Sequence, residues 1–407
     1  MTDTHYDVIV FGATSFVGQI VCQYLTTEYK GPLRWAAAGR SESKLRSVQQ
    51  ALGTSDEAMP ILLANADDPR SLEALCRQCD VIISTVGPYA LFGEPMVKAC
   101  VETGTDYCDL TGETQWIQQM VERYQAQAEK TGARIVHCCG FDSIPSDLGV
   151  YFLQQQAKAR QGEYCSSVKM RVKAMRGGFS GGTVASLINV IKEASKDPEL
   201  RKSLTNPYSI CPPSFQPKVR QHNIKGAEFD EDINGWIAPF VMSAINTRVV
   251  HRSNALAGAA YGEQFRYDEA VITGKGFKGR LAALAMTAGL GGLMIGGALA
   301  PSRWVLERFI LPKPGEGPSP EEQLSGLYDL RFFGTLNDGE LIRCKVTGDR
   351  DPGYGSTAKM LSQAAICLQA TDKATTGGGI WTPATAMGQP LIDRLEAHAG
   401  LKFESIS

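Results

Sequence analysis

Short apolar runs alternate with amphipathic stretches over the first 145 residues. The runs have the length of buried strands, and the stretches repeat apolar residues at the three- and four-residue spacing of helices. Strands are expected at 6–11, 33–39, 60–64, 80–85, 106–109 and 134–139, and helices at 16–25, 41–53, 69–78, 93–103 and 113–130. Strict alternation requires crossover connections, so residues 1–145 are predicted to form an α/β domain with a doubly wound, Rossmann-like parallel sheet.

The pattern changes after residue 145. A helix at 145–161 and a helix at 183–195 flank an alternating strand at 165–175, and the proline-interrupted stretch 198–217 is expected to be surface loop. Two further strands, 328–336 and 340–347, are separated by Asn-Asp-Gly, which is typical of a hairpin turn. Residues 146–354 are therefore expected to form a second domain with its own sheet.

Length and composition agree with two domains and favour a small-molecule partner. A chain of 407 residues with 43% hydrophobic content exceeds the size of most single cores. Lys plus Arg number 41 against 43 Asp plus Glu, so no strong field of one sign favours nucleic acid. The first residues show no basic leader, which favours the cytoplasm, and eleven scattered cysteines are expected to be reduced thiols. Neither the CxxC at 76–79 nor the five histidines have the spacing of a metal site, so no metal is predicted.

The motif GATSFVG at 12–18 carries the strongest chemical signal. It follows the first strand and opens the first helix, where Gly12 permits a sharp turn and Gly18 permits close packing of helix and sheet. Ser15 replaces the middle glycine of the common dinucleotide fingerprint, and its hydroxyl is a candidate contact to the cofactor. The predicted pyrophosphate-binding residues are Gly12, Ala13, Thr14, Ser15, Phe16, Val17 and Gly18.

The end of the second predicted strand indicates which dinucleotide is bound. NAD-selective sites place an acid there, whereas this chain has Gly39, Arg40 and Ser41. A guanidinium suits a phosphate, and Ser41 and Lys44 can add donors, so NADP(H) is predicted. Asp67, after the third strand, has two interpretations: an acceptor for the adenine amino group, or a cap for the next helix.

The fourth strand ends in Thr85, Val86, Gly87 and Pro88, near the crevice where cofactors lie in open α/β sheets. These residues are expected to contact the ribose or the nicotinamide. Hydride transfer needs no nucleophile from the protein but does need a proton donor. Candidates near the carboxyl ends of strands are Tyr89, Tyr107, Asp142 and Ser143, with a helix cap as the alternative role of Asp142 and a core role for His137.

Taken in order, these motifs resemble the saccharopine dehydrogenase-like oxidoreductases, a family that includes trans-acting enoyl reductases. The resemblance rests on GATSFVG, AAAGRS, STVGPYALFGEP, YCDLTGE and GFDSIPSDLG, and it continues in GGTVASLINVI at 181–191 and DPGYGSTAKM at 351–360. It implies an NADP-binding fold, a second α+β domain with a mixed or antiparallel sheet, and a return of residues 355–407 to the first domain. It also implies reduction of a double bond in a lipid chain.

One segment, 281–300, has no charge over twenty residues and follows Lys275, Lys278 and Arg280. Its length would span a bilayer, but its many glycines and alanines lower its hydrophobicity. Gly289, Gly292 and Gly296 favour close helix packing in a hairpin or a homodimer. Peripheral membrane contact, at the inner face of the plasma membrane, is the alternative.

The leading hypothesis is therefore an NADPH-dependent reductase of an enoyl-acyl or polyketide-type substrate. A saccharopine-type oxidoreductase acting on imines or amino acids is a second hypothesis. A third comes from another class: a non-catalytic NADPH-binding protein that acts at a membrane surface or on a partner.

Overall fold

The computed structural model describes residues 5–177, 181–217, 219–298 and 317–406. The chain divides into two compact units, each assembled from separate segments. Unit 1 comprises Met1–Ile144, Gly315–Pro318 and Gly353–Gly400, and unit 2 comprises Pro145–Pro314, Ser319–Pro352 and Leu401–Ser407.

Unit 1 contains a seven-stranded parallel sheet in the order β13-β6-β5-β4-β1-β2-β3. Its strands are β1 (Tyr6–Phe11), β2 (Trp35–Gly39), β3 (Ile61–Leu63), β4 (Cys79–Ser84), β5 (Asp106–Asp109), β6 (Arg134–Val136) and β13 (Gly379–Trp381). The strand order reverses between β1 and β4, which is the switch point where dinucleotides bind in Rossmann folds. The predicted doubly wound parallel sheet is confirmed.

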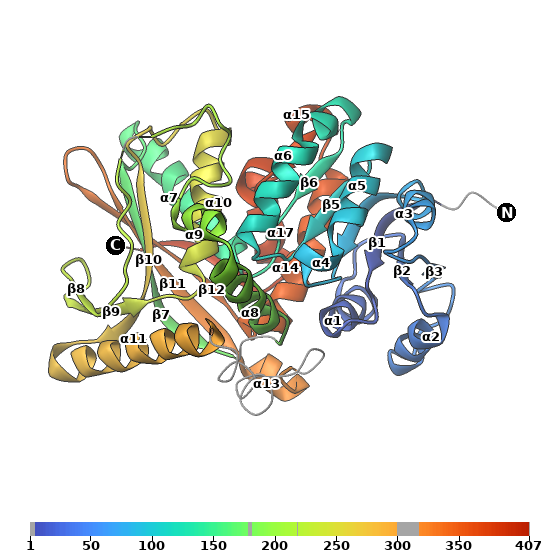
Figure 1. The fold of residues 1–407 in the computed structure, drawn as a ribbon, viewed down its shortest axis with the longest axis horizontal. Helices are drawn as coiled ribbons and strands as arrows, with labels where there is room; N and C mark the ends of the chain where they lie inside the picture. The colour runs from blue at the N-terminus through green and yellow to red at the C-terminus, as the bar shows by residue number, and fades with distance from the viewer. Residues whose placement is uncertain (1–4, 178–180, 218, 299–316, 407) are drawn as a thin grey trace. The chain divides into compact units, whose positions relative to one another are not determined.

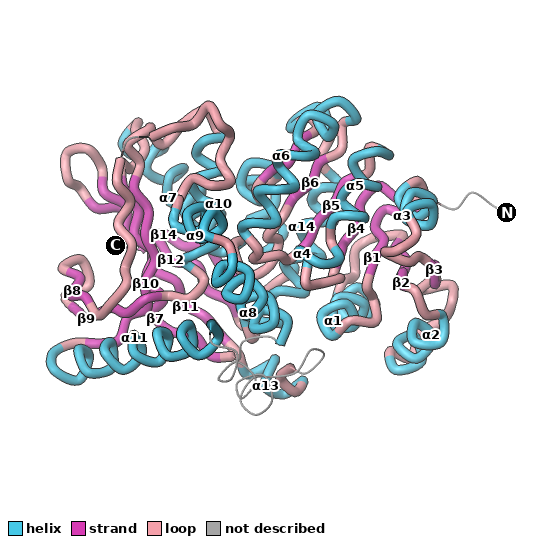
Figure 2. Tube along the Cα trace, viewed as in Figure 1, coloured by secondary structure: helices cyan, strands magenta, loops and turns pink. Residues whose placement is uncertain are grey.

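Helices cover both faces of this sheet (Figures 1 and 2). They are α1 (Phe16–Gln23, continued by a π-helical turn at Tyr24–Glu28), α2 (Glu42–Ala51), α3 (Pro69–Cys76), α4 (Tyr89–Phe92), α5 (Glu94–Thr103), α6 (Thr114–Thr131), α14 (Thr357–Ala370), α15 (Lys373–Thr376), α16 (Pro383–Ala386) and α17 (Gly388–His398). Helix α14 packs on β1, β4 and β5 beside α1 and α17, whereas α3, α5 and α6 pack together in another group. Helix α14 is almost completely buried and belongs to the core of unit 1.

Unit 2 contains a seven-stranded mixed sheet in the order β14-β12-β11-β7-β10-β9-β8. Among the described strands of this sheet, β7 and β10 pair in parallel and the other neighbours pair antiparallel. The strands are β7 (Ser167–Arg176), β8 (Glu228–Asp230), β9 (Gly235–Pro239), β10 (Arg266–Gly274), β11 (Leu327–Thr335), β12 (Leu341–Gly348) and β14 (Leu401–Ile406). The helices are α7 (Ile144–Gln161), α8 (Gly181–Lys196), α9 (Pro198–Thr205), α10 (Ser243–Leu256), α11 (Gly276–Ala298) and α13 (Pro320–Ser325).

Several local predictions are confirmed in unit 2, and others are wrong. Strands β11 and β12 pair around the predicted Asn-Asp-Gly turn, where Gly339 has φ +90°. The loop expected at 198–217 begins instead as helix α9. Pro198 occupies the first turn of this helix, where the backbone N–H that proline lacks would have no partner within the helix. The final strand β14 pairs with β12, so the expected return of the chain to unit 1 ends at Gly400.

The cysteines are free thiols, as expected. All eleven are in the thiol form and all except Cys211 are buried. They pack as small apolar side chains in the two units.

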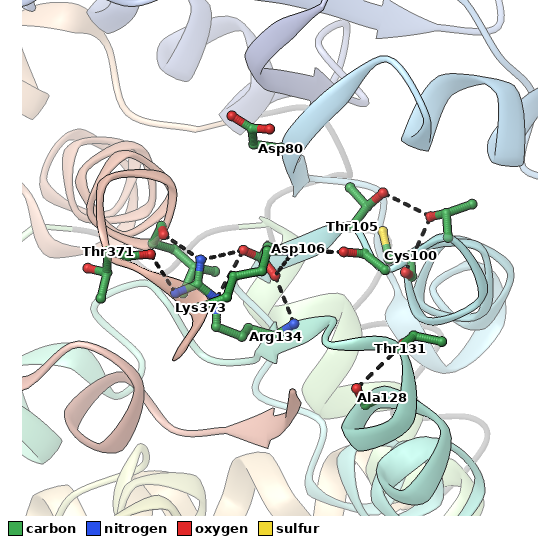
Figure 3. Close-up of polar contacts among 12 residues, drawn as sticks. Asp80, Cys100, Thr105, Asp106, Ala128, Thr131, Arg134, Thr371 and Lys373 are labelled. Atoms are coloured by element: carbon green, nitrogen blue, oxygen red, sulfur yellow. Dashed lines mark hydrogen bonds and ion pairs between the residues drawn. The ribbon is translucent and has the colours of Figure 1, made fainter. Parts of the chain in front are cut away.

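A buried ion pair holds the C-terminal end of α14 against the sheet of unit 1 (Figure 3). Arg134 at the start of β6 and Asp106 at the start of β5 are each 1% exposed, and Arg134 Nη2 lies 2.6 Å from Asp106 Oδ2. The same guanidinium donates to the carbonyl oxygens of Leu368 and Thr371, at 2.7 and 2.9 Å. Lys373 Nζ adds a second cation 3.1 Å from Asp106 Oδ1. The pair is thus fully hydrogen-bonded, as a buried charge requires.

Replacing Arg134 by methionine is expected to destabilise the protein by about 3–5 kcal/mol, because it leaves the Asp106 carboxylate buried with one cation fewer. Arg123→Met is the matched control: Arg123 also pairs with an acid, Glu94 at 2.7 Å, but its side chain is 52% exposed. That exposed pair is expected to contribute little to stability, because water and salt screen it. Urea unfolding of the three proteins measures both values, and equal losses would contradict the assigned role of Arg134.

Candidate active site

The turn between β1 and α1 depends on its glycines. Gly12 has φ +86°, and a Cβ built on it would lie 2.7 Å from Val86 Cγ2. A Cβ on Gly18 would lie 2.2 Å from the carbonyl oxygen of Gly12. Both positions therefore exclude any side chain, and the helix begins in close contact with the end of β1.

Ser15, which replaces the middle glycine of the fingerprint, caps α1. Its Oγ accepts a hydrogen bond from the Gly18 amide and donates one to Thr85 Oγ1, both at 2.9 Å. Thr85 Oγ1 in turn donates to the carbonyl oxygen of Gly12, also at 2.9 Å. In this arrangement the single proton of the Ser15 hydroxyl is donated to Thr85, and its contact to the cofactor stays a prediction.

The amides of the first turn of α1 remain as anion-binding groups. Those of Phe16 and Val17 have no acceptor inside the helix, as in any first helical turn. The positive end of the helix dipole adds to their attraction for phosphate. The Phe16 ring is directed to Tyr354, with ring centroids 4.6 Å apart, so the late glycine-rich block of the chain packs beside this turn.

Exposed cations lie at the end of β2, where a 2′-phosphate would bind. Arg40 and Lys44 are exposed and make no side-chain hydrogen bond or ion pair with the described residues. Ser41 Oγ accepts from the Lys44 amide at 3.4 Å and caps α2, as predicted. The fit of this position to NADP rests on an unneutralised guanidinium and ammonium at a helix N-terminus.

Asp67 does not cap the third helix. Asp68 is the N-cap of α3 and accepts from the Arg70 amide at 3.1 Å, so the capping alternative for Asp67 is wrong by one residue. The proline at the first position of α3 fixes the helix start one residue after Asp68. Asp67 is exposed, and its adenine contact stays a prediction.

The loop after β4 is held by a buried acid that the sequence analysis did not identify. The Gly87–Pro88 peptide bond is cis, and Gly87 is exposed. Glu113 accepts from the amides of Tyr89 and Ala90, at 2.8 and 3.0 Å, through its two carboxylate oxygens. Glu113 thereby fixes the loop that was predicted to contact the ribose or nicotinamide.

Most of the candidate proton donors are inaccessible. Tyr107 and Ser143 are fully buried. Tyr89 is 5% exposed, and its hydroxyl donates to the Ser84 carbonyl at 2.9 Å. Burial raises the pKa of both tyrosines well above their usual value. Their hydroxyl protons are therefore poorly placed for transfer to a substrate.

Asp142 differs from the other candidates because its side chain is only half-buried. Burial, and then the nearby Asp109 carboxylate, raise the pKa of Asp142 to about 7. A carboxyl group that exchanges its proton near neutral pH is suited to general acid catalysis. Asp142 follows β6, at the carboxyl edge of the parallel sheet.

Asp109 organises the turn that carries Asp142. Its Oδ2 lies 2.7 Å from His137 Nδ1, and its Oδ1 accepts from the amides of Thr111 and Cys138, at 3.1 and 3.2 Å. The Asp109 carbonyl also accepts from the Cys139 amide at 2.7 Å. One fully buried acid at the end of β5 thus fixes the backbone just before Asp142.

His137 is the side-chain partner of this acid as well as a core residue. It is 3% exposed, and its ring packs edge-on against Trp116 at 5.0 Å. On the other side of the turn, Thr357 Oγ1 accepts from the Phe141 amide at 3.0 Å. Neither contact was predicted from the sequence. One feature of the sequence could have indicated a buried partner for Asp109, because Asp109 is an acid at the end of a buried strand. Among the described residues, no group of three metal-ligating side chains occurs.

Comparison with known proteins identifies relatives over the full chain. Residues 8–136 match the saccharopine dehydrogenase NADP binding domain. A putative trans-acting enoyl reductase of Mycobacterium tuberculosis is 38% identical, with 99% of this chain and 98% of the relative covered. The trans-acting enoyl reductase of Mycobacterium bovis is 37% identical, with 97% and 96% covered.

A solved structure shares the fold at low sequence identity. Apo saccharopine dehydrogenase (L-Glu forming) from Saccharomyces cerevisiae aligns with a TM-score of 0.54 and 13% identity, over 99% of this chain and 100% of that chain. This likeness concerns the fold alone. By its full-length similarity, the chain belongs to the trans-acting enoyl reductase family and carries an NADP-binding domain of the saccharopine dehydrogenase type.

Proposed function

We propose that this protein is an NADPH-dependent reductase of the carbon–carbon double bond in a lipid-like enoyl-acyl or polyketide-type substrate. Its family is that of NADP-dependent oxidoreductases, with relatives named trans-acting enoyl reductase. The observation that carries the proposal is Asp142, a half-buried carboxyl group with a pKa of about 7 beside the cofactor edge of the sheet. Reduction of an enoyl group needs such a proton donor.

The chain would hold the cofactor through groups at three strand ends. The first-turn amides of α1 would bind the pyrophosphate, and Arg40 with Lys44 would bind the 2′-phosphate. The loop fixed by Glu113 would lie along the nicotinamide ribose. Bound NADPH supplies the hydride.

The protein itself supplies the proton. The Asp142 carboxyl would donate to the carbon next to the acyl carbonyl, while the electron pair of the double bond forms the new C–H bond there. The resulting Asp142 carboxylate then takes a proton from water. Burial, and then the nearby Asp109 carboxylate, raise the pKa of Asp142 so that it can hold a proton near neutral pH.

A lipid-like substrate also suggests where the protein works. We propose a cytoplasmic protein in peripheral contact with the inner face of the plasma membrane through helix α11. A homodimer formed through the same helix is the alternative use of this surface. Either arrangement would cover its exposed apolar side chains.

The arginines of unit 2 bear on the saccharopine-type alternative. Such enzymes need arginines that are free to bind substrate carboxylates. The buried Arg171 already pairs with Asp230 and Asp268, at 2.7 and 2.6 Å. Arg331 pairs with Asp329 at 2.6 Å. These two guanidinium groups are neutralised within the protein. Arg248 of α10 is also buried, but it donates to the carbonyl oxygens of Ala244 and Leu204 and forms no ion pair with the described residues. The substrate panel therefore distinguishes the two functions.

Turnover with a substrate panel tests the proposed function. The wild-type protein is expected to oxidise NADPH with medium- and long-chain 2-enoyl thioesters, and the product is expected to gain two hydrogen atoms by mass spectrometry. No oxidation is expected with an oxo acid and an amino acid supplied together. Tight NADPH binding without turnover of any enoyl thioester would contradict enzymatic reduction and support the non-catalytic alternative.

A further inference from the structure

Helix α11 exposes an unusual number of large apolar side chains. Over Gly276–Gly297 it is long and apolar enough to cross a membrane, and it is the single such helix among the described residues. Only 11% of its most apolar part is buried inside the protein. The exposed side chains, which are 44–79% accessible, are Phe277, Leu281, Leu284, Met286, Met294 and Ile295. In Figure 1, α11 lies along one border of unit 2, next to β9.

Four of these six apolar side chains form a stripe opposite the contact side of the helix. Phe277, Leu281, Leu284 and Ile295 are separated by four, three and eleven residues, which places them on one side of an α-helix. The contact side is narrow and made of small residues. A Cβ on Gly279 would lie 2.3 Å from the Gly274 carbonyl oxygen, and one on Gly297 would lie 3.3 Å from Ile191 of α8.

Two of the three glycines that the sequence assigned to close helix packing, Gly289 and Gly292, do not serve it within the described residues. A Cβ built on Gly289, Gly291 or Gly292 meets no atom within 4 Å. The last two residues of the predicted segment 281–300 lie outside the described residues. The described part of α11 therefore has one attached side and one open side.

Basic and aromatic residues gather at the N-terminal end of α11. Lys275, Lys278 and Arg280 are exposed and form no ion pair with the described residues, and residues 275–298 contain no acid. Arg280 lies over the Trp236 ring, 5.3 Å from its centroid. Phe229, 50% exposed, packs against Trp236 with ring centroids 5.8 Å apart. Aromatic rings beside cationic groups are typical of the membrane–water interface.

We propose that α11 binds an anionic membrane surface, lying parallel to it with the stripe of Phe277, Leu281, Leu284 and Ile295 among the acyl chains. Lys275, Lys278 and Arg280 would then lie at the level of the lipid phosphates. This inference rests on the proposed function in one respect: it gives a lipid-like substrate a short path from the bilayer to the protein.

The charges favour a membrane over a second copy of the chain as occupant. An anionic bilayer neutralises all three basic residues at once. The same helix of a second copy has no acidic residue to offer them. A parallel orientation follows because the opposite side of the helix is attached to β10 and α8, so the helix is not free to enter a bilayer from all sides.

Vesicle flotation of the full chain tests this proposal, with phosphatidylcholine vesicles that contain or lack about one-third phosphatidylglycerol. Binding is expected to anionic vesicles, and to be roughly 100-fold weaker on neutral ones, because the attraction of anionic lipid contributes about fivefold for each of the three basic residues. The double variant Leu281→Asp/Leu284→Asp is expected to lose at least about 100-fold in binding, since charge on the stripe opposes insertion. Lys275→Gln/Lys278→Gln is expected to lose only the preference for anionic lipid.

Leu324→Asp is the matched control, because Leu324 is 60% exposed but lies on α13 of the same unit, outside the stripe on α11. It should bind like wild type. Absence of wild-type flotation, or equal loss in the control, would overturn the membrane proposal. A stable dimer that is disrupted by Leu281→Asp/Leu284→Asp and does not float would assign the stripe to a second copy instead.

NADPH oxidation with a soluble short-chain enoyl thioester separates this proposal from the proposed function. Unchanged turnover in variants that no longer float would support a membrane role that is distinct from catalysis. Turnover without flotation of the wild type would overturn the membrane role alone, and flotation without turnover would overturn the reductase alone.

Discussion

Arg40→Glu is expected to weaken NADPH binding by about 100-fold or more, and to change NADH binding by no more than a few fold. A guanidinium can give a phosphate two charge-assisted hydrogen bonds, each contributing about 1.5–3 kcal/mol, and tenfold in affinity corresponds to about 1.4 kcal/mol. The free, exposed Arg40 at the N-terminus of α2 is well placed for this contact. The introduced carboxylate would also repel the 2′-phosphate.

Calorimetric titration of both dinucleotides into each variant measures the effect. Arg77→Glu provides the control: Arg77 is an equally exposed arginine, but it lies at the C-terminal end of α3, away from the carboxyl edge of the sheet. Its replacement should leave both affinities unchanged. Equal losses of NADPH and NADH affinity in Arg40→Glu would show that Arg40 does not bind the 2′-phosphate.

Asp142→Asn is expected to lower kcat for enoyl reduction by about 10²–10⁴-fold with little change in NADPH affinity, because a general acid contributes by that amount. In the wild type, kcat should be constant at low pH and fall about tenfold per pH unit above about 7, where the Asp142 carboxyl loses its proton. Stopped-flow reduction at several pH values separates this step from product release. An Asp142→Asn enzyme with more than half of the wild-type kcat would exclude Asp142 as the proton donor.

Asp109→Asn tests the role of the Asp142 carboxyl group in a second, independent way. The Asp109 carboxylate raises the pKa of Asp142, so its removal should move the fall in kcat to lower pH. The other charged or titratable groups at this turn are His137, Tyr89 and Glu113. His137→Gln should keep the pH of the fall near that of the wild type, provided the turn remains folded, which circular dichroism checks.

The fold of unit 1 could be predicted because each strand and helix there has a simple pattern. Strands such as β1 and β4 are buried apolar runs, and helices such as α2 have a capping serine and one apolar side. The periodicity did not reveal β13 or its place in the sheet. That strand has three residues and is recruited to the edge of β6 from a distant part of the chain.

Much of unit 2 was less predictable because polar residues occupy its interior. Helix α10 is buried on nearly all sides, including Arg248, His251 and Arg252, so it shows no apolar stripe. Strand β10 carries Asp268 and Glu269 in its centre, the first paired with Arg171 and the second hydrogen-bonded to the Tyr267 hydroxyl at 2.7 Å. Local patterns cannot show that distant partners will satisfy such groups.

The candidate site was predictable in position but not in detail. The glycine turn, Arg40 and Asp142 follow from motif spacing and strand ends. The roles of Asp109 and Glu113 do not, because each acts through backbone amides far along the chain. Ser15 shows the same limit. The sequence reveals a hydroxyl in place of a glycine, whereas the direction of that hydroxyl depends on Thr85, which directly follows strand β4.

Transfer of deuterium from 4-deuterated NADPH to a 2-enoyl thioester is the most direct test of the account. With one of the two C4 epimers, the wild-type protein should give a saturated product that carries one deuterium on the carbon distal to the carbonyl. The adjacent carbon should take its hydrogen from solvent. An unlabelled product with both epimers, or recovery of unchanged enoyl substrate while NADPH is bound, would contradict the assignment of this protein as an NADPH-dependent enoyl reductase.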